Sequence, residues 1–119
     1  MAGTGSGTKD IPLHLIDMAI AIGRIREVAS ETNLTALRDD WRRIAILERQ
    51  VAILSEASRR LNDEEKRLSA EIPWPQIAAI GNILRYEYKR VDIAILWDIC
   101  TVHIEPLSVA VERLMEMQR

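Results

Sequence analysis

The chain has 119 residues, of which 48% are hydrophobic, a size and composition that suit one domain with a buried core. Its formal net charge of −2 excludes a global basic field that would attract nucleic acid, so any RNA binding would need a local patch. The single cysteine excludes an internal disulfide and indicates a reducing, cytoplasmic setting, and no apolar run approaches the roughly 18 residues of a membrane span.

The N-terminal part is predicted to be a flexible segment followed by a long helix. Residues 1–9 read M-A-G-T-G-S-G-T-K, so we expect one folded domain over 10–119. A helix is predicted over Asp10–Ser30, because Pro12 is tolerated only in a first turn, which makes Asp10 the expected N-cap. Apolar side chains recur at helical spacing and are expected to face inward: Leu13, Ile16, Ile20, Ile25 and Val28.

A second long helix is predicted over Arg38–Leu61. Asn62 and Asp63 then end this helix or cap a short one over Asp63–Leu68. The apolar residues of the long helix are spaced by three, four, three and seven positions, as in a core helix with two neighbours. These residues are Ile44, Leu47, Val51, Leu54 and Leu61.

Proline positions define the third long helix. Residues 72–75, I-P-W-P, predict an extended lead-in, because a residue before proline avoids the helical conformation. Pro75 then suits the first turn of a helix that reaches Tyr86 or Tyr88. Its expected inward residues are Ile77, Ile80 and Leu84.

The last helix is predicted to begin at the N-cap Asp92 and to be broken or restarted at Pro106. Short connections make neighbouring helices antiparallel. The sequence therefore predicts an all-α, up-and-down bundle of four main helices with a short extra helix. The expected inward residues of the last helix are Ile95, Leu96 and Ile99, followed by Leu107, Val111 and Leu114 as far as Met117.

Few residues suggest metal or nucleophilic chemistry. His14 and His103 are the only histidines, and neither belongs to a His/Cys/Asp/Glu cluster, so we expect no metal and no cofactor. Cys100 lies beside the apolar face of the last helix and is predicted to be a small buried hydrophobe rather than a nucleophile.

Two groups of polar residues are open to more than one interpretation. Arg49 and Glu56 are seven residues apart and lie on one side of their helix, either as a structural ion pair or as the lining of a groove shared with the third helix. Further along, basic and aromatic residues interleave, which suits either contacts to phosphates and bases or a solvated helix end. The residues of this second group are Arg85, Tyr86, Tyr88, Lys89 and Arg90.

Several short motifs follow one another in a fixed order. They are L-S-E-A at Leu54–Ala57, E-I-P-W at Glu71–Trp74, G-N-I-L-R-Y-E-Y at Gly81–Tyr88, V-D at Val91–Asp92 and W-D-I at Trp97–Ile99. This order resembles the HepT-like toxin family of the HEPN superfamily. Members of that family show Ile-Gly-Glu-Ala, then Pro-x-Ile-Pro-Trp, then Arg-Asn-x-Leu-x-His-x-Tyr, then Val-Asp and a tryptophan.

The resemblance implies a HEPN-like helical bundle that forms a homodimer with two copies of the motif at the interface. It also implies a metal-independent ribonuclease, encoded beside a nucleotidyltransferase antitoxin that transfers AMP to the motif tyrosine. Tyr88 is the residue that matches this tyrosine. RNA, a second copy of the chain and the antitoxin are the expected partners, and the candidates for the binding groove are Arg49, Glu56, Lys89 and Arg90.

The chain departs from the family pattern at the residues that carry the chemistry. Gly81 stands at the motif arginine and Tyr86 at the motif histidine. Metal-free cleavage needs a base for the 2′-hydroxyl proton and a cation for the charge that grows on the phosphate. A phenol, with a pKa near about 10, stays protonated at a pH where an imidazole, near about 6.5, accepts a proton. We therefore expect weak or absent RNase activity, with Asn82, Arg85 and Tyr88 as the remaining candidates.

The alternative is an active RNase toxin with a rearranged site that uses Arg85, Tyr86 and Tyr88. Arg85 lies one turn beyond Gly81 and would supply the cation from a different backbone position. His103 would supply the base only if the C-terminal helix brings it to the groove.

Overall fold

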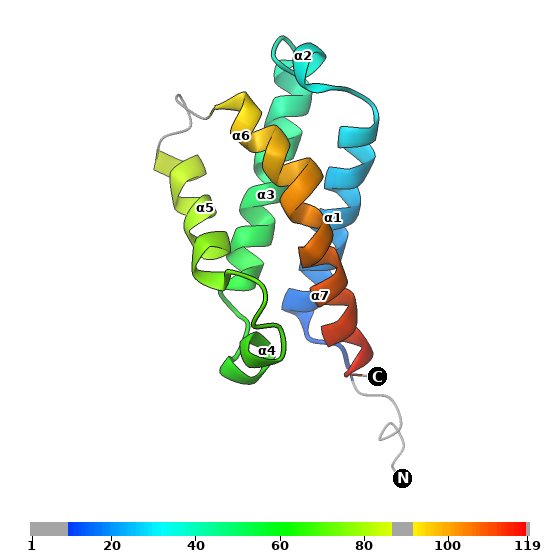
Figure 1. The fold of residues 1–119 in the computed structure, drawn as a ribbon, viewed down its shortest axis with the longest axis vertical. Coiled ribbons are helices and arrows are strands. Elements are labelled where there is room, and N and C mark those ends of the chain that lie inside the picture. The colour runs from blue at the N-terminus through cyan, green and yellow to red at the C-terminus, as the bar shows by residue number, and fades with distance from the viewer. Residues whose placement is uncertain (1–9, 87–91, 119) are drawn as a thin grey trace.

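The computed structural model describes the backbone of residues 10–86 and 92–118, and the side chains of that part except for residues 83–86. Every regular element in these ranges is helical (Figure 1). In chain order they are α1 (Leu13–Ser30), α2 (Leu34–Leu37), α3 (Trp41–Ser58), α4 (Asp63–Leu68), α5 (Trp74–Tyr86), α6 (Ile93–Asp98), the π-helical segment η3 (Ile99–His103) and α7 (Ile104–Glu116).

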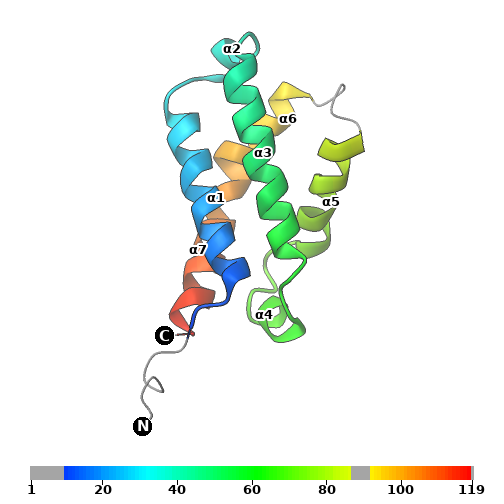
Figure 2. The ribbon, with the colours of Figure 1, turned by 180° about the vertical axis from the view of Figure 1, so that it is seen from behind.

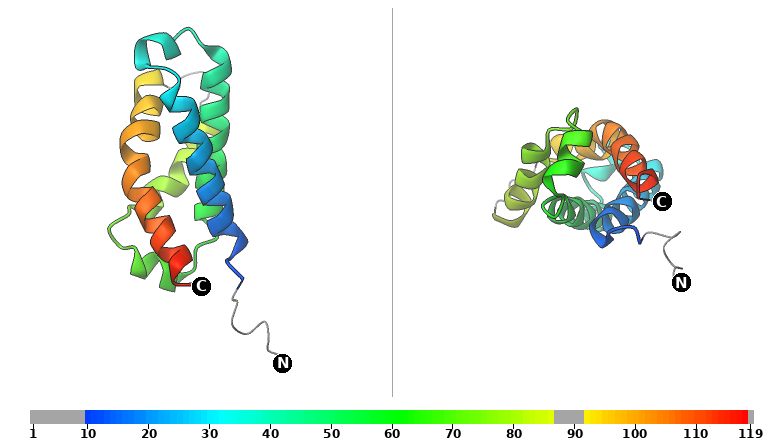
Figure 3. Two further views of the ribbon diagram at one scale, coloured as in Figure 1. Left: turned by 90° about the vertical axis from the view of Figure 1, so that its right-hand side faces the viewer. Right: turned by 90° about the horizontal axis from the view of Figure 1, so that it is seen from below.

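The long helices run alternately up and down. The elements α6, η3 and α7 form one continuous helix, seen from yellow to red in Figure 3, so the four main helices are α1, α3, α5 and α6–η3–α7. Figure 2 shows α3 between α1 and α5, and α7 also packs against α1. The predicted all-α bundle is confirmed, and the short helix α2 joins α1 to α3 in addition to the predicted short helix α4.

Side-chain caps start two helices where the sequence predicted them. Asn62 Oδ1 accepts a hydrogen bond from the Glu65 N–H (2.7 Å), and Glu65 Oε1 accepts one from the Asn62 N–H (2.9 Å). This capping box fixes the start of α4. Asp92 Oδ1 accepts a hydrogen bond from the Ala94 N–H (2.8 Å) and caps α6.

The predicted start of the first helix was wrong. The helix α1 begins at Leu13, and Pro12 rather than Asp10 occupies the N-cap position, without a side-chain cap. The proline carbonyl accepts a hydrogen bond from the Leu15 N–H (3.0 Å) while its backbone stays extended (ψ 139°). Proline therefore precedes the first turn instead of lying within it, since its fixed φ suits either position.

The predicted ends of the second long helix also differ from the structure. The helix α3 begins at Trp41, not at Arg38, because the carboxylate of Asp40 caps it by accepting a hydrogen bond from a backbone N–H three residues further on (3.1 Å). It ends at Ser58 instead of Leu61, and residues 59 and 60 form a turn.

The inward face of the first helix was predicted only in part: Ile25 is buried as expected and Val28 packs against the core, but two other residues do not face inward. Leu13 and Ile20, which were predicted to face inward, are 67% and 47% exposed. The helix carries two apolar stripes, and the one that meets the core follows the three-four-three spacing that a helix–helix seam prefers. Its members are Leu15, Met18, Ile22 and Ile25.

The inward faces of the other long helices were predicted more closely. Leu47, Val51, Leu54 and Leu61 are buried as expected, as are Leu96, Leu107, Val111 and Leu114. Ile95 was predicted to face inward and is 61% exposed. Consecutive residues of a helix point about 100° apart, so Ile95 and Leu96 do not share the buried face.

Pro106 does not break the last helix, contrary to one of the two predicted outcomes. The preceding segment η3 is π-helical, and the Ile104 N–H donates to the Ile99 carbonyl, five residues back. In a regular α-helix the ring of Pro106 would clash with the carbonyl of Val102. The wider π turn relieves this clash, and the helix continues to Glu116.

By length and composition alone, the continuous helix Ile93–Glu116 meets the criterion for a membrane span, with a mean hydropathy of 1.4. The core helix of a soluble protein meets the same criterion. Here the buried residues Leu96, Cys100, Ile104, Leu107 and Leu114 pack into the bundle.

A buried carboxylate joins α4 to α1. Glu65 is only 3% exposed, and its two carboxylate oxygens lie 3.0 and 3.2 Å from Nε2 of His14. The same carboxylate completes the capping box with Asn62, so one side chain both starts α4 and holds it against α1.

We predict that Glu65→Ala lowers the free energy of unfolding by about 1–3 kcal/mol, because the capping N–H and the imidazole of His14 lose their common partner. Denaturant unfolding measures this change. Glu64→Ala is the matched control, since Glu64 is exposed and its ion pair with Arg67 lies on the surface, and it should leave stability unchanged. Equal losses in the two variants would contradict the role given to Glu65.

Candidate functional site

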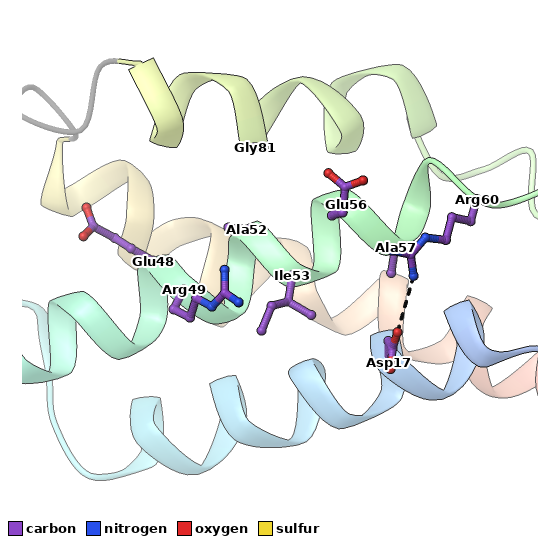
Figure 4. A pocket seen from close by; sticks show the side chains of 9 residues that line it. All are labelled: Asp17, Glu48, Arg49, Ala52, Ile53, Glu56, Ala57, Arg60 and Gly81. Atoms are coloured by element: carbon purple, nitrogen blue, oxygen red, sulfur yellow. Dashed lines mark ion pairs between the residues drawn. The ribbon is translucent and has the colours of Figure 1, made fainter.

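A groove of about 500 Å³ lies along α3, between α5 and α1. Figure 4 shows Gly81 on the α5 side and Asp17 on the α1 side, with α3 running between them. The structure places Arg49 and Glu56 in this one groove, which is the second of the two arrangements considered for them. The remaining lining residues are Glu48, Ala52, Ile53, Ala57 and Arg60.

The charges of this groove are mixed. Three carboxylates, from Asp17, Glu48 and Glu56, line it together with two guanidinium groups, from Arg49 and Arg60. Arg60 Nη1 lies 3.6 Å from Asp17 Oδ2, and partial burial raises the pKa of Glu48. The described lining therefore has no excess of positive charge and is not a basic phosphate cleft.

Opposite Gly81, the two helices α3 and α5 are joined by a serine. The hydroxyl of Ser55, on α3, donates to the carbonyl of Ala78 (2.9 Å) and accepts from the N–H of Gly81 (3.0 Å). Ser55 is 1% exposed, and a hydroxyl so deeply buried requires such partners. The motif glycine is therefore part of a helix–helix contact.

Further bonds come from Arg59, the C-cap residue of α3, and one of them reaches the motif residue after Gly81. Arg59 Nη2 donates to the carbonyl of Ala78 (2.9 Å) and to Oδ1 of Asn82 (3.0 Å). The sequence interpretation missed both Ser55 and Arg59. Their four-residue spacing, which puts them on one side at the C-terminal end of α3, is the signal that would have pointed to a shared contact.

The two histidines lie away from the groove that contains Gly81. His14 is bound to Glu65, as described above. His103, on η3, has its Nε2 3.2 Å from Asp98 Oδ2 and lines a different, largely apolar cavity of about 390 Å³ between α3, α5 and α7. The structure therefore does not bring His103 into the groove with Gly81 and Arg49.

Part of the predicted site falls at or beyond the end of α5. Arg85 and Tyr86 belong to the last turn of that helix, and their side chains are outside the described part of the structure. Tyr88, Lys89 and Arg90 lie outside the described residues altogether.

Within the described ranges, no three His, Cys, Asp or Glu side chains gather into a group that could hold a metal ion. Cys100 is 1% exposed, and burial raises the pKa of its thiol to about 12. A protonated and inaccessible thiol is a poor nucleophile.

Comparisons with known proteins point to one family. Residues 18–114 match the family described as ribonuclease HepT-like. A protein named "Probable ribonuclease HepT", from Thermococcus cleftensis, is 32% identical over 101 residues, which cover 85% of this chain and 92% of that protein. A candidate RNase of Methanocaldococcus jannaschii is 24% identical over 105 residues, covering 87% of this chain and 95% of the relative. No solved structure gave a significant match.

We predict that Cys100 resists iodoacetamide in the folded protein at pH 8 and reacts once the chain is unfolded in denaturant. With a pKa near 12, only about one thiol in ten thousand is ionised at that pH. The folded-state pKa lies above the ordinary value of 9.0, so the contribution of this thiol to stability is present below pH 9 and is lost as the pH rises from 9 towards 12. Mass spectrometry of the alkylated protein measures the reaction, and rapid labelling of the native chain would contradict the prediction.

Proposed function

The chain belongs to the ribonuclease HepT-like family, and from this we propose that it is a member that keeps the helical scaffold but has weak or no RNase activity. The proposal places it in a toxin–antitoxin system as a binding or regulatory module. The observation that carries it is the position of the imidazoles: neither histidine of the chain lies in the groove beside Gly81.

The first missing component is the base. Cleavage of RNA without a metal requires a group that takes the proton from the 2′-hydroxyl at neutral pH, and histidine is the side chain best suited to that task. His14 is bound to the buried carboxylate of Glu65, and His103 is on another side of the bundle, near Asp98. Position 86 carries a phenol in place of an imidazole, and phenols as a class stay protonated at neutral pH.

The second missing component is the cation at the motif position. Gly81 has no side chain, and its backbone is bonded to Ser55. Arg49 and Arg60 line the same groove, but three carboxylates line it with them, and Arg60 faces one of these, Asp17. Such a groove is poorly suited to stabilise the charge that develops on a phosphate during cleavage.

The proposal also includes a homodimer and a nucleotidyltransferase antitoxin as partners, with Tyr88 as the residue that would accept AMP. Exposed aliphatic side chains support an association surface: Ile95, Val102 and Val109, along the continuous last helix, are 61%, 56% and 59% exposed. Large exposed aliphatic residues favour contact with another protein surface.

We predict that the purified protein cleaves RNA at least about 10²-fold more slowly than a relative with an intact Arg-Asn-x-Leu-x-His-x-Tyr motif, because general acid–base catalysis alone typically contributes about 10²–10⁴-fold. Single-turnover cleavage with protein in excess and chelator present measures the rates. Tyr86→Phe should leave any residual rate unchanged. Rapid cleavage that Tyr86→Phe abolishes would instead establish the alternative, an active RNase with a rearranged site.

We predict further that the protein sediments as a dimer and co-purifies with a nucleotidyltransferase encoded beside it. Incubation of the pair with ATP should add one AMP to the chain, detected by mass spectrometry, and Tyr88→Phe should prevent the addition. A monomer at micromolar concentration that does not bind the nucleotidyltransferase would contradict this part of the proposal.

A further inference from the structure

We infer that Ser55 and Gly81 are a coupled pair: the Ser55 side chain fills the space that any side chain at the motif position would need. The motif arginine then cannot be restored at position 81 unless Ser55 is removed as well. The structural part of this inference stands on the contact alone, and only its consequence for RNA cleavage rests on the proposed function.

The steric argument comes from the distance between α3 and α5. A Cβ atom built on Gly81 would lie 2.6 Å from Oγ and 3.1 Å from Cβ of Ser55. Contacts between non-bonded heavy atoms are favourable only near 3.5–4.0 Å, so one of the two groups would have to move. An alanine, and still more an arginine, does not fit at position 81 against this serine.

The hydrogen bonds make the serine difficult to displace. Its hydroxyl connects the carbonyl of Ala78 to the N–H of Gly81, and the side chain is 1% exposed. Rotating the hydroxyl away would break both bonds inside a buried contact, where unpaired polar groups are costly. Arg59 holds the same turn of α5 from the outside, through Ala78 and Asn82.

The two residues that touch are also two positions at which this chain departs from the family pattern. Ser55 stands where the pattern has the glycine of Ile-Gly-Glu-Ala, and Gly81 stands where it has arginine. In both cases one of the two positions is a glycine. In the family pattern it is the position of Ser55, and in this chain it is position 81. The contact therefore accounts for two departures with one physical requirement, which is room for a single side chain.

A thermal unfolding cycle tests the pair. Gly81→Ala should lower the melting temperature by about 5–10 °C, because overpacking of a well-packed contact is destabilising. In a Ser55→Gly background the same change should lower it by less than about 2 °C, or raise it. Ser55→Ala should relieve only part of the loss, because the serine Cβ itself lies 3.1 Å from the new methyl group.

Gly23→Ala is the matched control. Gly23 is also an interior residue of a helix, α1, but among the described residues no atom beyond its neighbours and the nearby backbone of its own helix lies within 4 Å of a Cβ built on it. The substitution there should raise the melting temperature by about 2–5 °C, because alanine favours the helix over glycine. If Gly81→Ala is insoluble, recovery of soluble protein on adding Ser55→Gly is the equivalent readout. The inference would be overturned if Gly81→Ala changed the melting temperature equally with Ser55 and with Ser55→Gly, or if it raised the melting temperature as Gly23→Ala does.

Activity separates this inference from the proposed function. The double variant that combines Gly81→Arg and Tyr86→His is compared with the triple variant that also carries Ser55→Gly. RNA cleavage is expected only when Ser55→Gly is included, and equal cleavage without it would overturn the coupling. If the unfolding cycle shows coupling and the triple variant still does not cleave RNA, the coupled pair stands, and the proposal that positions 81 and 86 account for the lost activity fails.

Discussion

The close approach of α3 and α5 is the constraint on which the site depends. Ser55 bonds to both the carbonyl of Ala78 and the N–H of Gly81, so the backbone of α5 is held directly against a side chain of α3. Such proximity requires a residue without a Cβ at position 81. Position 81, where the family pattern has a charged side chain, therefore serves here as a contact point between two packed helices.

The polar side chains beside this contact bond to the protein's own backbone. A metal-free nuclease site needs a cation and a base that face the substrate. In this chain the hydroxyl of Ser55 and the guanidinium of Arg59 are directed towards peptide groups of α5 instead. The groove beside them is left with a mixture of carboxylates and guanidinium groups that includes the pair Asp17–Arg60. The hydroxyl of Ser55 and the guanidinium of Arg59 are thus engaged in holding α5 against α3.

Features that depend on neighbouring residues, such as helix caps, could be predicted from the sequence. Features that depend on contacts between distant residues could not. The caps at Asn62 and Asp92 follow from side chains that bond to the next turn, so their residues alone sufficed. The buried face of α1 was assigned only in part, because the helix carries two apolar stripes and packing against its neighbouring helices selects between them. The bond between Ser55 and Gly81 joins residues 26 positions apart, and periodicity within one helix carries no information about such a pair.

The family motifs of this chain divide according to what they do in the structure. Trp74 is buried and its indole N–H donates to the Ser69 carbonyl, Asp92 caps α6, and Ala57 packs in the core. These residues are retained, and each would cost stability if changed. Three positions differ: Ser55 replaces a glycine and packs against Gly81, whereas at 81 and 86 the family pattern has side chains suited to phosphate charge and proton transfer. At these motifs the chain therefore has the residues that support the fold and lacks, at 81 and 86, the side chains suited to catalysis.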